Sequence, residues 1–351
     1  MRHDLLSMDF EELSAFIAAL ELPKYRAAQM FEWFHRHTAS FDANFFKQMN
    51  NLPKSLIRTL EETCITSYCT TTEIKSSASS ETKKYLFALS DGVLIESVQM
   101  NYSFGDSVCI STQAGCKMGC SFCASGAGGF IRNLTAGEML AQVHTVRKNI
   151  LGKLSGIVLM GCGEPLDNFE QTIKFLKIIA DPKSLGISMR SITLSTCGLV
   201  PEIRKLADMC LKINLAISLH APNDRLRKAI MPIANVYSIR ELMDVCRYYT
   251  ERTARRITFE YALIAGTNDQ PSHAHELIKL LSGMLCHVNL IPINSIAEED
   301  TIKRSDLQHF AKILNKNHIP TTIRRTIGAD INAACGQLRA RPWGSGATRN
   351  A

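Results

Sequence analysis

Apolar and polar positions along residues 108–326 follow a pattern typical of strands that alternate with helices. Short apolar runs predict six strands, and a segment with helical apolar spacing follows each of them. Because parallel strands need crossover connections, six such units predict an α/β fold with a parallel sheet. Six units are too few for a complete eight-fold barrel, so we expect a partial (βα)6 barrel. The predicted strands are 108–112, 156–160, 191–195, 213–219, 257–261 and 287–292, with a last strand at 321–326; the predicted helices are 136–148, 169–179, 200–208, 240–249, 273–281 and 305–316.

The first 104 residues have a different pattern. Helical apolar spacing over 9–20, a second helix that opens near Pro23 and a third after Pro53 predict a small helical unit. Farther on, Ser90-Asp91-Gly92 separates two apolar runs, which is a strong β-hairpin signal. We therefore expect four segments, namely a helical accessory domain at 1–62, a β-hairpin extension at 63–104, the α/β core at 105–341 and a tail at 342–351.

Polar and glycine-rich sequences fall where the predicted strands end. In parallel sheets of this kind, ligands gather at the carboxyl ends of the strands. The sequence therefore predicts a ligand site at this edge of the sheet. The segments in question are 115–123 after the first strand, 161–165 after the second, 195–198 at the third, 218–220 at the fourth and Asn294 just past the sixth.

The composition is that of an ordinary globular protein, with 46% apolar and 21% charged residues. The N-terminus lacks the apolar run of a signal peptide, and no window is long and apolar enough to span a bilayer. We expect a cytoplasmic protein with no membrane partner. In that reducing compartment, twelve cysteines favour thiols, metal ligands or redox catalysts over a disulfide framework. Five sit singly among apolar neighbours and are predicted to be small buried hydrophobes, namely Cys64, Cys69, Cys210, Cys246 and Cys286.

The net charge of +7 is compatible with an anionic partner without requiring one. Several basic residues lie in the predicted helical unit, and composition alone favours a solvated charged face. The alternative is a surface that binds phosphates. The residues are Lys24, Arg26, Arg36, Lys47, Lys54 and Arg58, with His35 and His37 beside them.

Cys116, Cys120 and Cys123 form a C-x3-C-x2-C pattern in a glycine-rich loop. Structural zinc needs four ligands, and no fourth Cys or His follows at ligand spacing. An iron–sulfur cluster held by three thiolates accounts better for the pattern and leaves one iron open to a substrate. A zinc-stabilised RNA-binding module without catalysis remains the alternative of a different class.

With Phe122 as its aromatic position, the cysteine pattern resembles the signature of radical S-adenosylmethionine enzymes. The turn at 163–165 resembles the motif that meets the methionine amino group in that superfamily. Further segments resemble the RlmN/Cfr family of radical RNA methyltransferases, and most closely its RlmN branch. These segments are 107–113, 194–196, 218–224, 289–294 and 333–338, and the resemblance runs from the helical unit to about Arg341.

The resemblance assigns roles to individual residues. Cys116, Cys120 and Cys123 would hold a [4Fe-4S] cluster whose open iron binds S-adenosylmethionine, and two molecules of S-adenosylmethionine would be used per methylation. Cys335 would carry the methyl group as S-methylcysteine, Cys109 would resolve the intermediate through a transient disulfide with Cys335, and Glu96 would accept a proton. The S-adenosylmethionine site would comprise Gly163, Glu164, Ser195, Ser218, Leu219, His220 and Asn294.

The two special cysteines make chemical sense. Carbon 2 of adenine is electron-poor, so it does not attack the sulfonium methyl directly. The Cys335 thiolate is a good nucleophile and would take the methyl group first. A radical formed from the second S-adenosylmethionine would remove hydrogen from the S-methyl group, and the methylene radical would add to the ring. Attack of Cys109 on Cys335 would then release the product and leave a disulfide that must be reduced.

The resemblance implies adenine-C2 methylation of 23S ribosomal RNA at the peptidyl-transferase centre and of the adenosine next to the anticodon in tRNA. It also implies an external one-electron reductant, such as flavodoxin or ferredoxin, and a monomer. Two enzymatic alternatives remain: C8 methylation of the Cfr type, which gives antibiotic resistance, and a radical enzyme that acts on a small molecule.

The chain departs from the commoner family pattern at Cys162, Cys197 and Asn332. The two cysteines are interpreted as packing variants.

Overall fold

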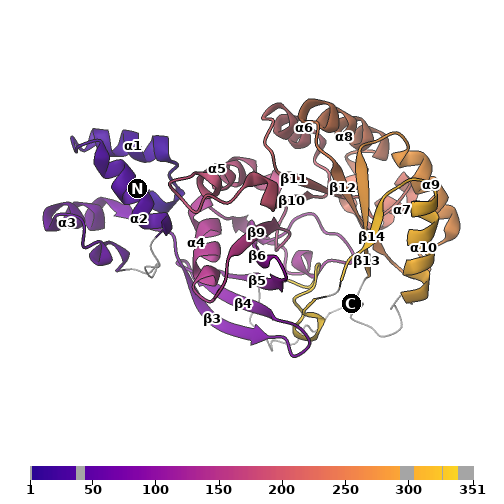
Figure 1. Ribbon diagram of the computed structural model, residues 1–351, viewed down its shortest axis with the longest axis horizontal. Coiled ribbons are helices and arrows are strands. Elements are labelled where there is room, and N and C mark those ends of the chain that lie inside the picture. The colour runs from indigo at the N-terminus through magenta and orange to yellow at the C-terminus, as the bar shows by residue number, and fades with distance from the viewer. Residues whose placement is uncertain (1, 37–43, 293–303, 326, 339–351) are drawn as a thin grey trace.

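A ten-stranded mixed sheet forms the centre of the protein. The computed structural model describes residues 2–36, 44–292, 304–325 and 327–338. Figure 1 shows the sheet running through the larger, right-hand part of the molecule and down to the hairpin. In spatial order its strands are β14 (Thr321–Ile323), β13 (Cys286–Pro292), β12 (Ile257–Leu263), β11 (Asn214–Ser218), β10 (Ile192–Thr196), β9 (Leu154–Leu159), β6 (Gly105–Cys109), β5 (Leu94–Tyr102), β4 (Thr82–Leu89) and β3 (Cys69–Ser76).

The seven strands from β14 to β6 are mutually parallel. Helices cover the outer side of the curved sheet (Figure 1), and the predicted partial (βα)6 barrel is thereby confirmed. The central strand β11 is covered on both faces, and its residues Leu215, Ala216 and Ile217 are all essentially inaccessible. The helices are α4 (Ala136–Arg147), α5 (Phe169–Ala180), α6 (Val200–Asp208), α7 (Asp224–Ile230), α8 (Ile239–Thr253), α9 (Pro271–Leu281) and α10 (Arg304–Lys316).

The strands β3, β4 and β5 extend the parallel sheet as an antiparallel meander, which joins it through the β5–β6 pair. The predicted hairpin turn lies between β4 and β5, where Gly92 has a φ of 81° and the side chain of Asp91 accepts a hydrogen bond from Val93 N. In the register, Lys84 lies opposite Val98, and Val98 lies opposite Cys109. Residues directly opposite in a ladder point to the same face, so the hairpin and the end of β6 share one surface.

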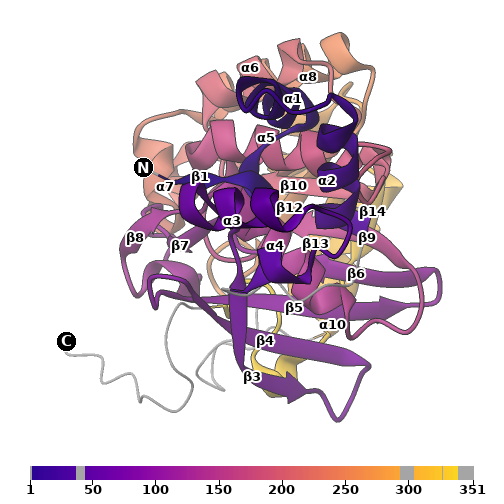
Figure 2. The same cartoon turned by 90° about the vertical axis from the view of Figure 1, so that its left-hand side faces the viewer.

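The predicted helical unit contains α1 (Phe10–Ala19), α2 (Tyr25–Arg36) and α3 (Lys54–Thr63). Its core includes Phe31, Trp33 and Phe34. Figure 2 shows these three helices in front of the barrel, beside α4 and α5. The unit is therefore a compact appendage of the core.

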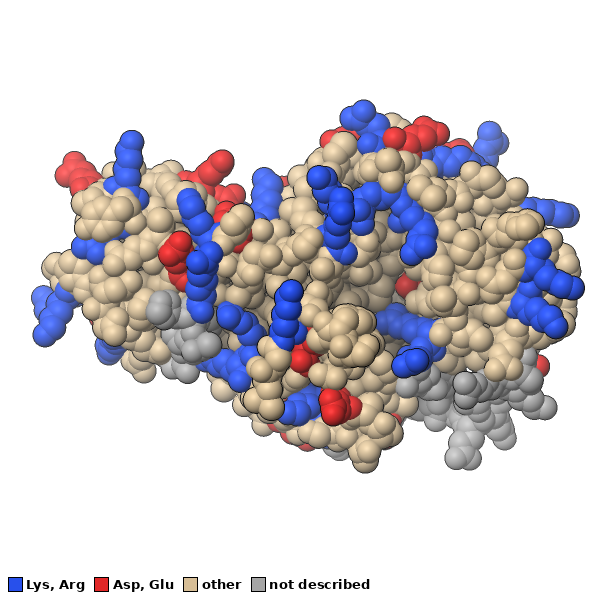
Figure 3. All heavy atoms as spheres, viewed as in Figure 1, with Lys and Arg blue, Asp and Glu red and all other residues tan. Residues whose placement is uncertain are grey.

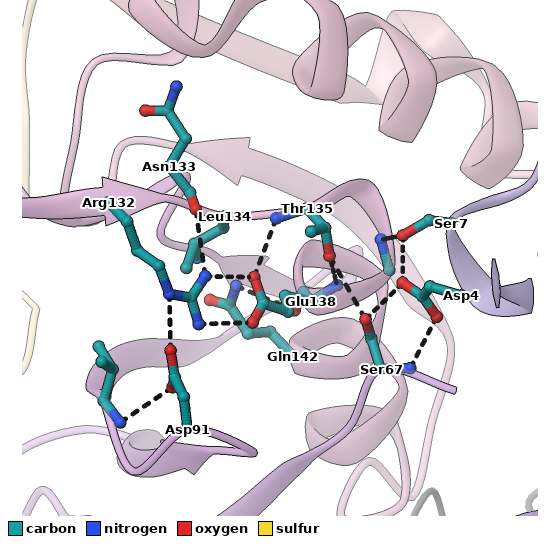
Figure 4. Close-up of polar contacts among 12 residues, drawn as sticks. Asp4, Ser7, Ser67, Asp91, Arg132, Asn133, Leu134, Thr135, Glu138 and Gln142 are labelled. Atoms are coloured by element: carbon teal, nitrogen blue, oxygen red, sulfur yellow. Dashed lines mark hydrogen bonds and ion pairs between the residues drawn. The ribbon is translucent and has the colours of Figure 1, made fainter. Parts of the chain in front are cut away.

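Asp4 and Ser7 join the helical unit to the amino end of α4 (Figure 4). The carboxylate of Asp4 accepts hydrogen bonds from Ser67 N at 2.8 Å and Ser67 Oγ at 2.6 Å. Ser7 Oγ accepts from Gly137 N at 2.8 Å. A side chain at Gly137 would collide with Asp4, since an added Cβ would lie 2.6 Å from Oδ2. This close approach fixes the unit on the core.

Two residues of the predicted basic face also connect the helical unit to the core. His35 is fully buried, with Nδ1 3.3 Å from Nε2 of His144 in α4. Arg36 donates to the carbonyls of Pro182 and Ser184. The interpretation of His35 as part of a solvated or phosphate-binding face is therefore wrong, and His37 lies outside the described residues.

Four of the five singly placed cysteines are buried as predicted, but Cys210 is exposed. It lies just past the end of α6 with a φ of 50°, where the chain turns back towards β11. Cys162 and Cys197 are buried, in keeping with a packing role.

In the part of the chain that the structure describes, none of the helices combines the length and apolarity needed to cross a bilayer.

Candidate active site

The three cysteines of the C-x3-C-x2-C pattern lie in a loop between β7 (Gln113–Gly115) and β8 (Phe130–Asn133), just beyond the carboxyl end of β6. Gly115 has a φ of 75°, and any Cβ there would overlap the carbonyl of Gly129. The two ends of the loop meet here, because Cys116 N donates a hydrogen bond to Gly129 O at 3.1 Å. Only glycine fits at position 115, so the close approach of Gly115 to Gly129 fixes the conformation of the loop.

The thiols of Cys116, Cys120 and Cys123 lie close enough to influence one another. Burial raises the pKa of Cys116 to about 11 and that of Cys120 to about 12, and the neighbouring thiols add to both shifts. Without metal, the thiols of Cys116 and Cys120 are therefore protonated at neutral pH, and cluster binding must displace their protons. Among residues 2–36, 44–292, 304–325 and 327–338, no three Cys, His, Asp or Glu side chains surround a single ion position. A cluster does not need such convergence, because each thiolate binds a different iron.

Arg227, in α7, is a buried cation beside this loop. Its Nη2 donates to Cys197 O at 2.6 Å and Ser218 O at 3.2 Å, and its Nε donates to Leu219 O at 3.2 Å. Nη1 is buried and has no hydrogen-bond partner among the described residues. Its positive charge partly offsets the rise in the pKa of Cys120, and Cys120 packs against the apolar cluster of Leu226, the residue before Arg227. A buried, incompletely satisfied cation suits an anionic group, so the residues present fit a thiolate-bound cluster and the carboxylate of its ligand.

Gly163 and Glu164 form a turn after β9, and close contacts and hydrogen bonds fix its conformation. Gly163 has a φ of 106°, and an added Cβ would lie 2.7 Å from Gln113 N. The carboxylate of Glu164 accepts hydrogen bonds from Leu166 N at 3.0 Å and from Cys197 N at 2.8 Å. Burial raises the pKa of Glu164, and these hydrogen bonds lower it. The turn therefore connects the carboxyl ends of β9 and β10.

His220 connects the end of β11 to the cysteine loop. Its ring packs edge-on against Phe122, with the ring centroids 4.8 Å apart. Its Nδ1 accepts a hydrogen bond from Ala262 N at 2.9 Å, so the neutral ring carries its proton on Nε2. Burial, with a smaller contribution from Arg227, lowers the pKa of His220 to about 3. Ser195, Ser218 and Leu219 lie at the ends of β10 and β11 nearby, whereas Asn294 lies outside the described residues.

The structure brings Cys109 and Cys335 to the same place. Cys109 ends β6 and belongs to a small apolar cluster with Val98, Met100 and Leu338. Cys335 lies in the C-terminal loop, residues 327–338, which packs on this cluster. Burial raises the pKa of Cys109 to about 12, with a smaller contribution from Cys335. Ala333 and Leu338, on either side of Cys335, pack on the cluster of Cys109, which brings the two cysteines into the same region.

Arg324 follows β14 and places a positive charge beside both thiols. Its backbone N donates to Leu290 O at 2.8 Å, and its Nη1 lies 3.8 Å from Oε2 of the buried Glu260. Desolvation raises the pKa of Cys335, and Arg324 lowers it. Cys335 and Arg324 line one cavity of about 50 Å³. Figure 3 shows a hollow near the middle of this side of the molecule, with Lys and Arg side chains around it.

The hairpin holds the C-terminal loop on one side. Lys84 Nζ donates to Asn332 O at 2.9 Å and pairs with Oε1 of Glu96 at 2.9 Å. Asp330 accepts hydrogen bonds from Ser77 Oγ and Ala78 N, both at 2.8 Å. Backbone and neighbouring side chains therefore hold the loop at Asn332, whose φ is 51°.

The cysteine loop holds the C-terminal loop on the other side. Ala124 N donates to Gly336 O at 2.6 Å, and Ser125 Oγ donates to Leu338 O at 2.8 Å. Cys335 therefore lies between a segment that flanks the metal-ligand candidates and a hairpin that carries Glu96. Sequence patterns missed Lys84, Arg227 and Asp330, because their partners come from distant parts of the chain.

Arg132 connects the cysteine loop to the rest of the core (Figure 4). Its two Nη atoms form a bidentate ion pair with the carboxylate of Glu138, at 2.7 and 2.8 Å. Its Nε donates to Asp91 Oδ2 at 2.7 Å. Glu138 is also part of the capping box of α4 with Thr135. One side chain thus joins β8, α4 and the hairpin turn, and it lowers the pKa of Asp91.

Comparison with known protein families matches the helical unit and the α/β core separately. Residues 3–66 match the ribosomal RNA large subunit methyltransferase N-terminal domain, and residues 110–280 match the radical SAM superfamily. The chain is 50% identical to the probable dual-specificity RNA methyltransferase RlmN of Clostridium novyi, over 96% of this chain and 97% of that protein. The corresponding protein of Alkaliphilus metalliredigens is 52% identical over 96% and 95%.

A solved structure is similar over almost the whole chain. A radical SAM methyltransferase from Sphaerobacter thermophilus superposes with a TM-score of 0.91 and shares 43% sequence identity. The match covers 97% of this chain and 100% of that one. The similarity thus includes the helical unit, the hairpin and the barrel.

Proposed function

The chain belongs to the RlmN family of radical S-adenosylmethionine RNA methyltransferases, and from this premise we propose that it methylates carbon 2 of adenosine. Its proposed substrates are 23S ribosomal RNA, at the peptidyl-transferase centre, and tRNA, at the adenosine next to the anticodon. The observation that supports the proposal best is that the loop of Cys335 packs, through Ala333 and Leu338, on the apolar cluster that contains Cys109, with Arg324 and Cys335 lining one cavity. Enzymes that methylate nucleophilic atoms need no second thiol, whereas transfer to an electron-poor carbon needs a carrier and a group that releases it.

Cys116, Cys120 and Cys123 would hold a [4Fe-4S] cluster, which with bound S-adenosylmethionine supplies a carbon-centred radical. Arg227 would balance negative charge there through its unsatisfied Nη1. Gly163, Glu164, Ser195, Ser218, Leu219 and His220 would form the S-adenosylmethionine site, together with Asn294. Two molecules would be used per product, one for the methyl group and one for the radical.

Cys335 would act as the methyl carrier. Burial raises the pKa of its thiol, and Arg324 opposes that rise. As the thiolate it would attack the sulfonium methyl and become a thioether. Loss of a hydrogen atom from that S-methyl group gives a carbon radical, which forms a bond to carbon 2 of the base. Protein and RNA are then joined through one methylene group.

Cys109 and Glu96 would complete the turnover. Glu96 accepts the proton that leaves carbon 2, and the Cys109 thiolate attacks Sγ of Cys335. Before this attack the adduct would give up its unpaired electron to the cluster. The carbon–sulfur bond then breaks with its electron pair on the methylene carbon, which takes up a proton and becomes the methyl group of the product, and a disulfide between the two cysteines remains. An external reductant such as flavodoxin or ferredoxin supplies electrons for cleavage of S-adenosylmethionine, and reduction of the disulfide restores both thiols.

The proposal extends to the setting of the reaction. The helical unit, residues 1–62, would bind RNA, and the enzyme would act as a cytoplasmic monomer. An unpaired adenosine is the substrate form that the chemistry requires, because carbon 2 must leave the stack to reach Cys335.

Anaerobic reconstitution and mass spectrometry test this function. The wild-type protein should hold about four irons and produce 2-methyladenosine in RNA. C335A should abolish methyl transfer and retain S-adenosylmethionine binding, whereas C109A should accumulate the protein–RNA adduct. Production of 8-methyladenosine would contradict the C2 assignment, and colourless protein with one zinc would contradict radical chemistry altogether.

A further inference from the structure

Tyr102, which is half-buried, and Phe104, which is exposed, form an aromatic pair at the connection between β5 and β6. Their rings are nearly parallel, with an interplanar angle of 5° and centroids 5.0 Å apart. Phe104 is 67% exposed, although aromatic side chains of this size normally contribute to a core. One face of the stack is therefore open to a further flat group.

The pair lies beside the methyl carrier. Tyr102 lines the same cavity as Cys335 and Arg324. The charges of Cys335, Cys109 and Arg324 all act on its hydroxyl, and burial raises the pKa of that group. Phe104 continues the stack from the cavity to solvent, so the two rings lead from the surface to the proposed reaction site.

The backbone holds the pair in place. Gly105, directly after Phe104, has a φ of 121°, and an added Cβ would lie 2.8 Å from Lys153 O. Phe104 O accepts a hydrogen bond from Ser155 Oγ at 2.8 Å. A rigid aromatic surface loses little conformational entropy when a ligand stacks on it.

The surrounding charge favours a nucleic acid over an apolar peptide. Arg324 and the exposed Arg325 line the same cavity. A stacking surface next to guanidinium groups matches an unstacked nucleotide, because the base meets the ring and the phosphates meet the cations.

We propose that the stacked rings of Tyr102 and Phe104 form a platform for one nucleobase of the RNA, the unpaired base next to the target adenosine. This inference rests on the proposed function, since it takes RNA as the substrate. The platform keeps the flanking base out of the helix stack while the target base approaches Cys335. A purely structural role for the pair predicts a buried Phe104, because an exposed ring adds little to the stability of a hairpin.

Binding of a stem-loop RNA with 2-aminopurine beside the target adenosine tests the platform. F104A should weaken binding by about 5- to 150-fold, the range that corresponds to loss of one base–aromatic stack. It should also remove the fluorescence quenching of 2-aminopurine that stacking produces in the wild-type complex. F104W, which keeps a flat ring, should restore both signals.

Salt dependence and a matched control separate stacking from charge effects. F104A should leave the slope of log affinity against log salt unchanged, whereas R325Q should reduce it by about 0.7 to 0.9. Leu285 is 53% exposed and directly precedes β13, at the amino end of a barrel strand, so L285A should bind RNA like the wild type. Methylation of Cys335 by S-adenosylmethionine alone should be the same in F104A, which shows that the variant is folded.

The platform would be overturned if F104A bound the RNA as tightly as the wild type and quenched 2-aminopurine equally. Failure of the proposed function has a different signature, namely a wild-type protein that yields no methyladenosine. The two failures can therefore be told apart in one set of measurements.

Discussion

Lys84 Nζ lies 2.9 Å from Oε1 of Glu96, and both side chains are almost completely buried, at 3% and 0% exposure. The same ammonium donates to Asn332 O in the C-terminal loop. One cation therefore joins the proposed proton acceptor to the segment that carries Cys335. Without a counter-charge, a buried carboxylate tends to become neutral and loses its capacity to accept a proton.

We expect K84M to destabilise the protein by about 3–5 kcal/mol, because it removes the buried positive charge that faces the Glu96 carboxylate. Urea unfolding measures the change. Lys205 forms an exposed pair with Glu202 at 3.6 Å and provides the control, since K205M should cost no more than about 1 kcal/mol. The double variant K84M/E96L should recover most of the lost stability. Equal effects of K84M and K205M would contradict a structural role for the buried pair.

D330A should loosen the C-terminal loop, because Asp330 accepts three hydrogen bonds from the connection between β3 and β4. Hydrogen exchange should become faster in residues 327–338, and methyl transfer to RNA should slow several-fold while S-adenosylmethionine binding is retained. Asp269, whose side chain accepts a hydrogen bond from Gly266 N on another exposed loop, supplies the control D269A. Unchanged exchange in the C-terminal loop of D330A would show that the tether is dispensable.

Stability should fall in mild acid because His35 and His144 are buried without charge. Burial lowers the pKa of His35 to about 3 and that of His144 well below its usual value. An unfolded histidine titrates near 6.5, so between about pH 6.5 and pH 3 the unfolded chain binds more protons than the folded one. Each histidine should then remove about 1.4 kcal/mol of stability per unit fall in pH across this window.

Thermal unfolding from pH 7.5 to pH 4.5 measures this slope. H144Q should make the slope shallower, while replacement of the exposed His275 by Gln should not change it. A slope that is the same in H144Q and in the wild type would mean that other groups control acid stability. Because the pair lies between α2 and α4, acid should first release the helical unit from the core.

G163A should damage the turn that carries Glu164. A new Cβ would lie 2.7 Å from Gln113 N, and the backbone φ of 106° is unfavourable for any side chain. Gly266 offers a matched control, because its φ is 69° and no described atom lies within 4 Å of an added Cβ. We expect G266A to cost about 1 kcal/mol and G163A distinctly more. Equilibrium dialysis should also show weaker S-adenosylmethionine binding by G163A only.

The sequence predicted the parallel strands well because their burial on two faces requires continuous apolar runs. It missed α7, which is only seven residues long and is preceded by a polar turn. It also extended β14 to residue 326, whereas the strand ends at Ile323. Short elements contain too few apolar positions for a period to be recognised.

The cysteine loop could be recognised because its residues are close together in the chain. The pairing of Lys84 with Glu96 could not, since it depends on the register of two strands and on the loop that covers them. From sequence alone, a single Glu in a hairpin is expected to be solvated, yet Glu96 is completely buried. Long-range contacts of this kind decide the burial of charged groups and leave no periodic signal.

The position of the C-terminal loop has a consequence for shortened chains. This loop covers Val98, Met100 and Cys109 and is bonded to both the hairpin and the cysteine loop. Loss of residues from 327 onward would remove Cys335 and would also open an apolar patch, with the Lys84–Glu96 pair, to water. Such patches promote self-association. A nonsense mutation near the end of the reading frame would therefore yield an insoluble protein, not merely an inactive one.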